Sequence, residues 1–98
     1  MSSWALVTGA TVGIGESFTR LLASNRYNIV LVARDVEKLN ERAQSLEATY
    51  GVKTHVIQAD LATDSGCGLV EKYIANNEIE VLINNAGFGI NKAFIYCS

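Results

Sequence analysis

The chain has 98 residues, of which 49% are hydrophobic and 18% charged, and a formal charge of −2 at pH 7, as expected for one soluble globular domain. Acidic and basic residues are interspersed without a basic stripe, so we expect neither nucleic acid nor a membrane surface as a partner. The longest apolar run, residues 29–33, is too short to cross a bilayer, and the start lacks a signal-peptide pattern, so we expect a cytoplasmic protein.

The first half of the chain alternates between strand and helix patterns. Residues 4–8 predict a short buried strand, and the continuous apolar run over residues 28–33 is typical of a strand buried on both faces. Between these strands, apolar residues at helical spacing predict a helix that ends near Asn25. The stripe that this helix is expected to bury consists of Ile14, Phe18, Leu21 and Leu22.

The second half repeats the alternation. Asp35 is expected to cap a second helix, and Gly51 fits the position after its last turn. Residues 53–59 predict a third strand, residues 65–76 a weaker helix, and residues 81–83 a fourth strand. The second helix is expected to bury Val36, Leu39, Ala43, Leu46 and Tyr50, and the third Val70, Tyr73 and Ile74.

The order βαβαβαβ predicts an α/β fold with a parallel sheet and crossover helices. Right-handed crossovers place strands two and three outward from strand one, and strand four on its other side. We therefore predict an incomplete Rossmann-like, doubly wound sheet in the strand order 3-2-1-4, forming one partial domain over residues 1–98. The chain direction across the sheet reverses between strands one and four, so their carboxyl ends, at Thr8 and Asn84, should border a ligand crevice.

The sequence TGATVGIG at residues 8–15 is a glycine-rich turn from the first strand into the first helix. Glycine allows positive φ and the close approach of a phosphate, and the helix N-terminus offers unpaired N–H groups. The spacing GxxxGxG differs from the GxGxxG of the standard dinucleotide fingerprint, and a plain strand–helix turn remains an alternative. A P-loop is rejected because Glu16 stands where that motif needs lysine.

Arg34 directly follows the second strand, where the type of residue bears on the nucleotide. An acidic residue there would favour the ribose hydroxyls of NAD or of an adenosyl cofactor in a methyl-transfer fold, whereas arginine accommodates the 2′-phosphate of NADP. Arg34 therefore favours NADP over NAD, with a solvated loop charge as the alternative. Asp60, after the third strand, is suited either to accept from an exocyclic amine or to cap a turn. His55 is the only histidine, and Cys67 and Cys97 form no CxxC pair, so we predict free thiols and no metal site.

These motifs together resemble the classical short-chain dehydrogenase/reductases over essentially the whole chain, and NNAG at residues 84–87 completes the set. The resemblance implies a hydrogen bond between Thr8 and Asn84 that stabilises the central strands. It also implies the parts of the cofactor that the remaining motif residues contact. Gly13, Ile14 and Gly15 are expected at the pyrophosphate, with Gly9 as a further cofactor-binding residue, Thr11 at the adenosine ribose, Arg34 at the 2′-phosphate, Asp60 and Leu61 at the adenine, and Asn85, Ala86 and Gly87 at the cofactor ribose region.

The catalytic residues of that family, a serine and a YxxxK pair, have no counterpart in the 98 residues. Leu31, Thr54 and Asn77 stand four positions after Tyr27, Tyr50 and Tyr73, and Tyr96 lies too near Ser98. In the family, the tyrosine acts as general acid and base and the lysine lowers its pKa. We therefore assign no catalytic residue and expect the chain as given to be inactive.

Two interpretations remain. The first is a truncated, NADP-binding N-terminal half of an NAD(P)-dependent oxidoreductase that transfers hydride between carbonyl and alcohol. The second is a short nucleotide-binding protein without turnover, or a module completed by another chain. In both, we expect strand four to form an open sheet edge flanked by Phe88, Phe94 and Ile95, which favours self-association. The residues that would shape a substrate pocket are not in the sequence, so no substrate is predicted.

Overall fold

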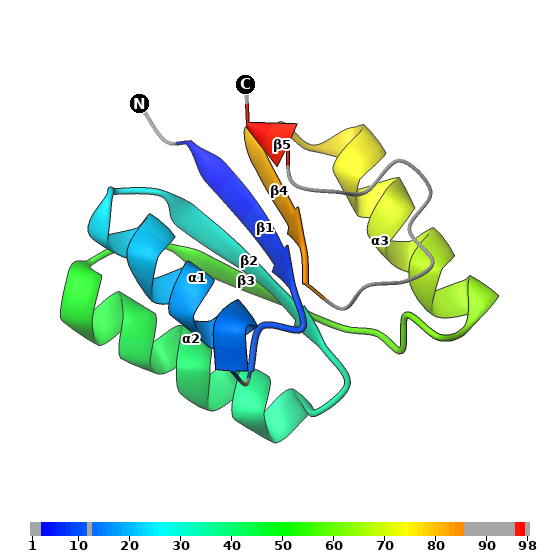
Figure 1. Ribbon diagram of the computed structural model, residues 1–98, viewed down its shortest axis with the longest axis horizontal. Coiled ribbons are helices and arrows are strands. Elements are labelled where there is room, and N and C mark those ends of the chain that lie inside the picture. Colours follow the sequence, from blue (N-terminus) through cyan, green and yellow to red (C-terminus); the bar gives the residue numbers. More distant parts are fainter. Residues whose placement is uncertain (1–2, 12, 86–95, 98) are drawn as a thin grey trace.

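The computed structural model describes residues 3–11, 13–85 and 96–97, and within them the strands form one sheet in the order β3-β2-β1-β4-β5 (Figure 1). β1 (Trp4–Thr8), β2 (Asn28–Ala33), β3 (Thr54–Gln58) and β4 (Val81–Asn84) are parallel. The short β5 (Tyr96–Cys97) runs antiparallel to β4. The predicted α/β fold and the strand order 3-2-1-4 are confirmed.

The helices are divided between the two faces of the sheet. α1 (Gly13–Ser24) and α2 (Val36–Tyr50) cover one face, and α3 (Asp64–Asn76) covers the other (Figure 1). This division follows from right-handed crossovers, because the chain leaves β1 in one direction across the sheet and returns to its other side before β4. None of the helices in the described part of the chain is long and apolar enough to cross a membrane.

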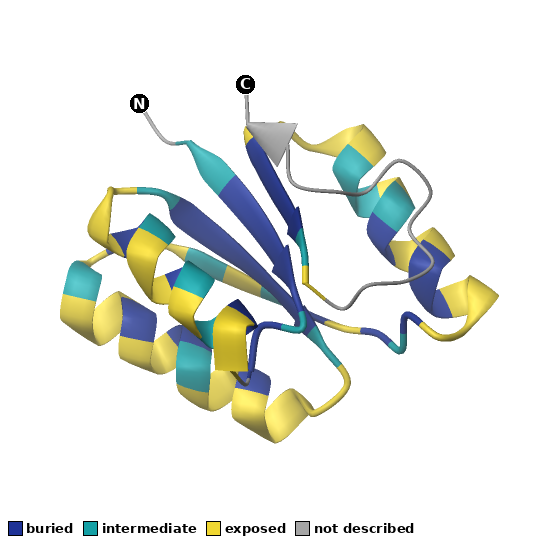
Figure 2. Cartoon of the chain, in the orientation of Figure 1, coloured by how far each residue is buried: buried dark blue, intermediate teal, exposed yellow. Residues whose placement is uncertain are grey.

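Alternation along the strands builds two hydrophobic cores. In β1, Val7 packs with the α1 and α2 side, while its neighbour Leu6 packs with the α3 side. In β2, Leu31 and Val30 divide in the same way, and both are fully buried. Figure 2 shows the consequence, with dark blue central strands and yellow outer helix surfaces. The centre of the sheet is therefore enclosed on both faces, while the turn after β2, at Arg34 and Asp35, is exposed.

The face that α1 buries differs from the predicted stripe. Ile14 and Leu21 are 66% and 57% exposed, although Phe18 and Leu22 do pack partly against the core. The residues that α1 buries are small and four positions apart: Gly15, Thr19 and Ala23. Positions four apart lie on one helical face, and small side chains there let the helix lie close to the sheet. The prediction was wrong for Ile14 and Leu21, because it followed the large apolar residues only.

The ends of α2 form as predicted. The Asp35 Oδ1 atom accepts hydrogen bonds from the backbone N–H groups of Glu37 and Lys38 at 3.1 and 3.2 Å. Gly51, with a φ of 71°, ends the helix in the left-handed region. The prediction that Val36 belongs to the core is wrong, since Val36 is 39% exposed. Val36 lies in the first turn of α2, directly after the exposed residues Arg34 and Asp35.

α3 also forms as predicted, despite its two glycines. Thr63 caps it, with Oγ1 accepting from the Gly66 N–H at 3.0 Å. Val70 is fully buried, and Tyr73 and Ile74 pack partly against the same core. The helix therefore begins one residue earlier than predicted, at Asp64, and presents the expected face to the sheet.

β5 changes the edge of the sheet. Cys97 pairs with Val81 and Tyr96 with Leu82, so the prediction that β4 is an open edge is wrong over these two pairs. Phe88, Phe94 and Ile95, which were expected to flank that edge, lie outside the described residues. Self-association of the chain stays a prediction.

Candidate functional site

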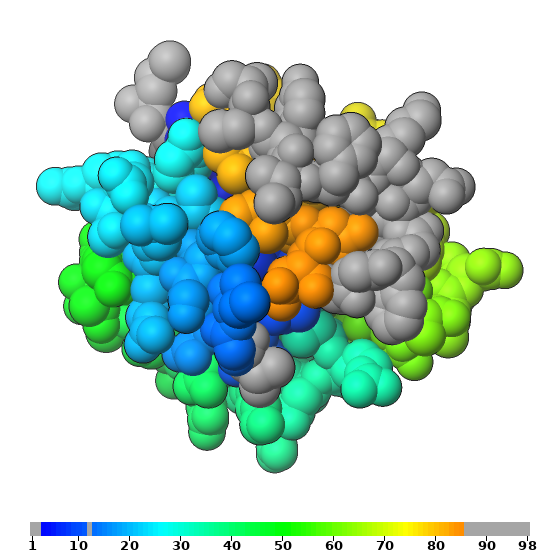
Figure 3. Space-filling model, viewed as in Figure 1, coloured from blue at the N-terminus to red at the C-terminus, as the bar shows by residue number. Residues whose placement is uncertain are grey.

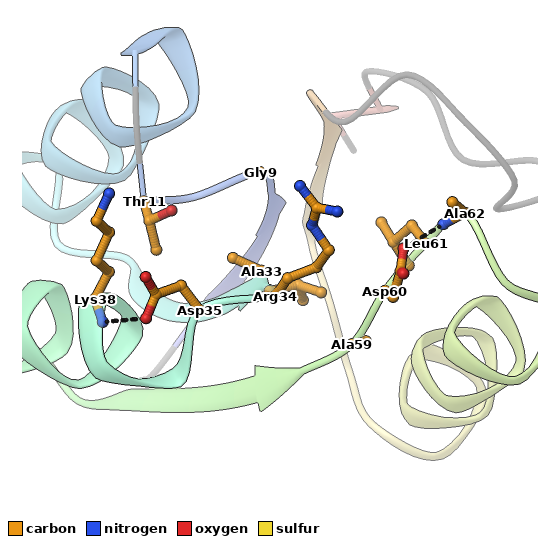
Figure 4. A pocket seen from close by; sticks show the side chains of 11 residues that line it. Gly9, Thr11, Ala33, Arg34, Asp35, Lys38, Ala59, Asp60, Leu61 and Ala62 are labelled. Carbon is orange, nitrogen blue, oxygen red and sulfur yellow. Dashed lines mark hydrogen bonds between the residues drawn. The ribbon is translucent and has the colours of Figure 1, made fainter.

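A cavity of about 710 Å³ lies at the carboxyl ends of β1, β2 and β3 (Figure 4). This volume falls in the range of small-molecule sites, roughly 300–1,000 Å³. The lining residues come from the three strand ends and the first turn of α2. They are Gly9, Thr11, Val32, Ala33, Arg34, Asp35, Lys38, Ala59, Asp60, Leu61 and Ala62. Five residues that the sequence singled out, Gly9, Thr11, Arg34, Asp60 and Leu61, thus line one cavity.

The glycine-rich turn borders this cavity and requires glycine at particular positions. Gly9 and Gly13 have φ values of 61° and 58°, in the left-handed region that side chains disfavour. A Cβ atom at Gly15 would lie 1.9 Å from the Gly9 carbonyl oxygen, so a side chain there would displace the backbone. The turn therefore brings the start of α1 directly against the end of β1.

A hydrogen bond joins the ends of β1 and β4. The Thr8 hydroxyl donates to Asn84 Oδ1 at 2.8 Å, and the two residues are partners in the parallel register. The bond predicted between the central strands is therefore present. In Figure 3 the orange end of β4 lies beside the blue start of α1, so the two sides of the predicted crevice meet here.

Asn85 follows β4 and lies at the same junction. Its Nδ2 atom is 2.9 Å from the position that a Cβ of Gly15 would occupy. The asparagine side chain therefore contacts the start of α1, next to the glycine-rich turn and outside the cavity lining. Ala86 and Gly87, the other two predicted residues of this motif, lie outside the described residues.

Arg34 supplies the main positive charge of the cavity. It is exposed at the end of β2, and its guanidinium has no hydrogen-bond or ion-pair partner among the residues that the structure describes. Figure 4 shows it between Thr11 and Lys38 on one side and Asp60 on the other. An unpaired guanidinium at a cavity wall is suited to bind an anionic group in bidentate fashion.

Lys38 is a second cation of the cavity, which the sequence reasoning missed. It lies in the first turn of α2, after the Asp35 cap, and lines the same cavity as Arg34. The sequence shows that Lys38 lies four positions after Arg34, but it does not show that the first turn of α2 lies beside the cavity. Asp35, between the two cations, caps α2 through its Oδ1 atom.

Asp60 and Leu61 form the wall opposite Lys38 (Figure 4). Asp60 Oδ1 accepts from the Ala62 N–H at 2.9 Å, so the turn-capping role that the sequence left open is observed. A Cβ at Gly66 would lie 2.0 Å from the Asp60 carbonyl oxygen, which shows how closely α3 approaches this turn. Leu61 is buried and gives the cavity an apolar wall.

The predicted residues therefore separate into two adjoining groups. Thr11, Arg34, Asp60 and Leu61 line the cavity together with Gly9, whereas the start of α1 and Asn85 lie beside it. Ile14, whose side chain is largely exposed, belongs to the second group. No group of three or more metal-ligating side chains occurs within residues 3–11, 13–85 and 96–97. The arrangement is suited to an extended ligand with an anionic group near Arg34.

A sequence profile described as short chain dehydrogenase matches residues 3–97. The chain belongs to the short-chain dehydrogenase family. One similar member is the very-long-chain 3-oxoacyl-CoA reductase-A of Danio rerio, 42% identical over 87 residues. Another is the 17-beta-hydroxysteroid dehydrogenase type 3 of Homo sapiens, 39% identical over 87 residues. Each alignment covers 89% of this chain but only 27% and 28% of these relatives, so the chain spans less than a third of their length.

A solved structure of the short-chain dehydrogenase family supports the same assignment. The short-chain dehydrogenase from Sphingobium yanoikuyae, in complex with NADPH, matches with a TM-score of 0.84 at 37% identity. The match covers 88% of this chain and 34% of that protein. The resemblance that the sequence motifs indicated and the Rossmann-like architecture are both confirmed.

Proposed function

We propose that this chain forms the cofactor-binding half of an NADP(H)-dependent oxidoreductase that transfers hydride between a carbonyl and an alcohol. The observation that carries the proposal is the Arg34 guanidinium at the cavity wall, which has no partner among the described residues, together with Lys38 in the same lining. A 2′-phosphate carries up to two negative charges and several acceptor oxygens, which two cations in one cavity suit well. Membership in the short-chain dehydrogenase family and the NADPH complex of the Sphingobium protein support the choice of cofactor.

We assign the parts of a dinucleotide to the cavity residues and to the start of α1 beside them. Thr11 and Arg34 would hold the phosphorylated ribose, and Asp60 and Leu61 the adenine. The N–H groups at the start of α1 would hold the pyrophosphate, close to Gly15, where a side chain has no room. When bound, the nicotinamide would supply or accept the hydride.

The first test is a titration of the chain with NADPH and with NADH, followed by cofactor fluorescence. Arg34→Glu should weaken NADPH binding about 10- to 100-fold, because charged hydrogen bonds to the 2′-phosphate are lost, and should leave NADH nearly unchanged. Arg26→Glu is the matched control, since Arg26 is exposed in the turn before β2, at the opposite end of the strand. If the unmodified chain binds neither nucleotide, or if Arg34→Glu weakens both equally, the proposal is wrong.

The second candidate is nucleotide binding without turnover. It requires only the cavity and the glycine-rich turn, which the described residues supply. Both candidates predict the same NADPH titration and differ in carbonyl reduction. The curated relatives are named for a 3-oxoacyl-CoA and a 17-beta-hydroxysteroid, so we propose carbonyls of these two kinds as the first substrates to assay.

A further inference from the structure

Arg42 connects the middle of α2 to the glycine-rich turn. Its Nε atom donates a hydrogen bond to the Thr11 carbonyl oxygen at 3.2 Å, although the two residues are 31 positions apart. The same Nε atom lies 3.5 Å from Glu16 Oε2, in the first turn of α1. The Arg42 side chain is only 34% exposed, so this contact is partly shielded from water.

The bond holds the glycine-rich turn at a residue that lines the cavity. Thr11 is 6% exposed, and Arg42 itself is not part of the lining. Glycine-rich turns bind phosphate through N–H groups, and a carbonyl oxygen turned toward the phosphate would repel it. A carbonyl that is bonded to α2 is kept from that orientation.

The contact of Arg42 with Glu16 also bears on the charge at the start of α1. Glu16 belongs to the first turn of α1, where a bound pyrophosphate would also lie, and like charges repel. Arg42 and Arg20, the latter at 3.8 Å, both pair with Glu16 and offset its charge. Loss of Arg42 would therefore act through the Thr11 bond or through Glu16, and variants must separate the two.

We propose that Arg42 is a positioning residue whose Nε–H fixes the Thr11 carbonyl and so holds the glycine-rich turn ready for the pyrophosphate. The proposal rests on the proposed function, because it assigns Arg42 a part in NADP(H) binding. Its particular claim is that the donor at the Nε position matters more than the positive charge.

Three substitutions of Arg42 separate donor from charge. In Arg42→Gln, the amide nitrogen stands the same number of bonds from the backbone as Nε, so the donor remains and the charge is lost. In Arg42→Lys, a methylene group takes that position, so the charge remains and the donor is displaced. Arg42→Met removes both. All three side chains are good helix formers, so α2 should tolerate them.

The binding measurement is an NADPH titration of the full chain and its variants. Loss of one partly buried hydrogen bond should weaken binding about 5- to 10-fold in Arg42→Met and Arg42→Lys. Arg42→Gln should stay within about twofold of the unmodified chain. The reverse order, with Arg42→Lys unchanged and Arg42→Gln weakened, would show that only the charge matters and would overturn the proposal. Equal binding by all three variants would overturn it as well.

A second measurement does not need the nucleotide. Amide hydrogen exchange of the ligand-free chain reports opening of the glycine-rich turn. We expect faster exchange at residues 9–15 in Arg42→Met and Arg42→Lys, and rescue in Arg42→Gln. If the unmodified chain fails to bind NADPH, the proposed function fails and with it the binding role of Arg42, while the exchange pattern still decides whether Arg42 holds the turn.

Discussion

The Thr8 hydroxyl donates a 2.8 Å hydrogen bond to Asn84 Oδ1 and joins residues that lie 76 positions apart in the sequence. The two residues are register partners at the carboxyl ends of β1 and β4. The residue that follows each strand belongs to the candidate site: Gly9 after β1 and Asn85 after β4. The bond therefore sets the spacing between the two sides of the crevice at the point where the strand order reverses.

Thr8→Val should lower the free energy of unfolding by about 1 kcal/mol, because it removes the donor to Asn84 while keeping the shape of a fully buried side chain. Thr8→Ser is the matched control, since serine keeps the hydroxyl and loses a methyl group. Urea unfolding of both variants measures the difference. Equal stability of Thr8→Val and the unmodified chain would show that the bond does not stabilise the sheet.

Lys38→Ala should weaken NADPH binding about 3- to 10-fold and leave NADH binding unchanged, because Lys38 is the second cation near the expected 2′-phosphate. Lys53→Ala is a suitable control, because Lys53 is exposed just before β3, at the opposite end of the sheet from the cavity. A comparable loss for both nucleotides would place Lys38 away from the 2′-phosphate.

Alanine at Gly66 and at Gly68 should have opposite effects on stability. A Cβ at Gly66 would lie 2.0 Å from the Asp60 carbonyl oxygen, so we expect the free energy of unfolding to fall by about 1–3 kcal/mol. A Cβ at Gly68 would meet nothing within 4 Å, and alanine should raise the free energy by about 0.5–1 kcal/mol through helix propensity. Urea unfolding compares the two variants, and a stabilising Gly66→Ala would contradict the close approach of α3.

Stability should decline in mildly alkaline solution. Burial, and then the carboxylate of Glu71, raises the pKa of the Cys67 thiol above its ordinary value. Below the ordinary thiol pKa, both folded and unfolded chains keep the proton and the contribution of Cys67 is constant. As the pH rises through that value, about 8.5, the unfolded chain ionises first, so the free energy of unfolding falls until the folded thiol also loses its proton.

Urea unfolding at about pH 7.5 and pH 9.5 tests this expectation, in a Cys97→Ser background that leaves one thiol. Cys67→Ala should reduce the decline between the two values, because alanine does not ionise. The pKa of Tyr73 is also raised by burial, but tyrosine ionises mainly above about pH 10 and adds little in this interval. A decline that is identical with and without Cys67 would exclude the thiol as its cause.

The 98-residue chain should bind NADPH without oxidising it in the presence of a carbonyl substrate. General acid–base catalysis typically contributes about 10²- to 10⁴-fold, and the chain lacks the tyrosine and lysine that provide it in the family. Absorbance of NADPH over time measures turnover, and fluorescence of the same sample confirms binding. Turnover at rates typical of dehydrogenases would show that other residues of this chain supply the proton.

Much of the fold could be predicted because buried parallel strands have a distinctive pattern. β2 was placed at its observed bounds, Asn28–Ala33, since few segments other than a strand covered on both faces are continuously apolar. The alternation of strands and helices, with the handedness of their crossovers, then determined the order of the first four strands. The caps of α2 at Asp35 and Gly51 could also be predicted, because a cap depends on one residue and its immediate neighbours.

The features that were not predicted correctly depend on contacts between segments that are distant in the sequence. The buried face of α1 is set by how closely Gly15 lies against Gly9, which a stripe of large residues does not reveal. Lys38 lines the cavity because α2 begins beside it. Arg42 matters because its side chain reaches from α2 to the Thr11 carbonyl in the glycine-rich turn. β5 pairs with β4 over two residues only, which is too short for an apolar pattern that would predict a strand.

The sequence by itself therefore determined the strand order, the family resemblance and the positions of the glycine-rich turn, Arg34 and Asn84. These follow from local patterns and from rules of chain connection, which require no knowledge of distances. Only the tertiary structure decided that Thr11, Arg34, Lys38 and Asp60 line one cavity and that Arg42 donates a hydrogen bond to the Thr11 carbonyl oxygen. The reason is physical, since burial and hydrogen bonding at the site arise between residues brought together from three strand ends and the helices beside them.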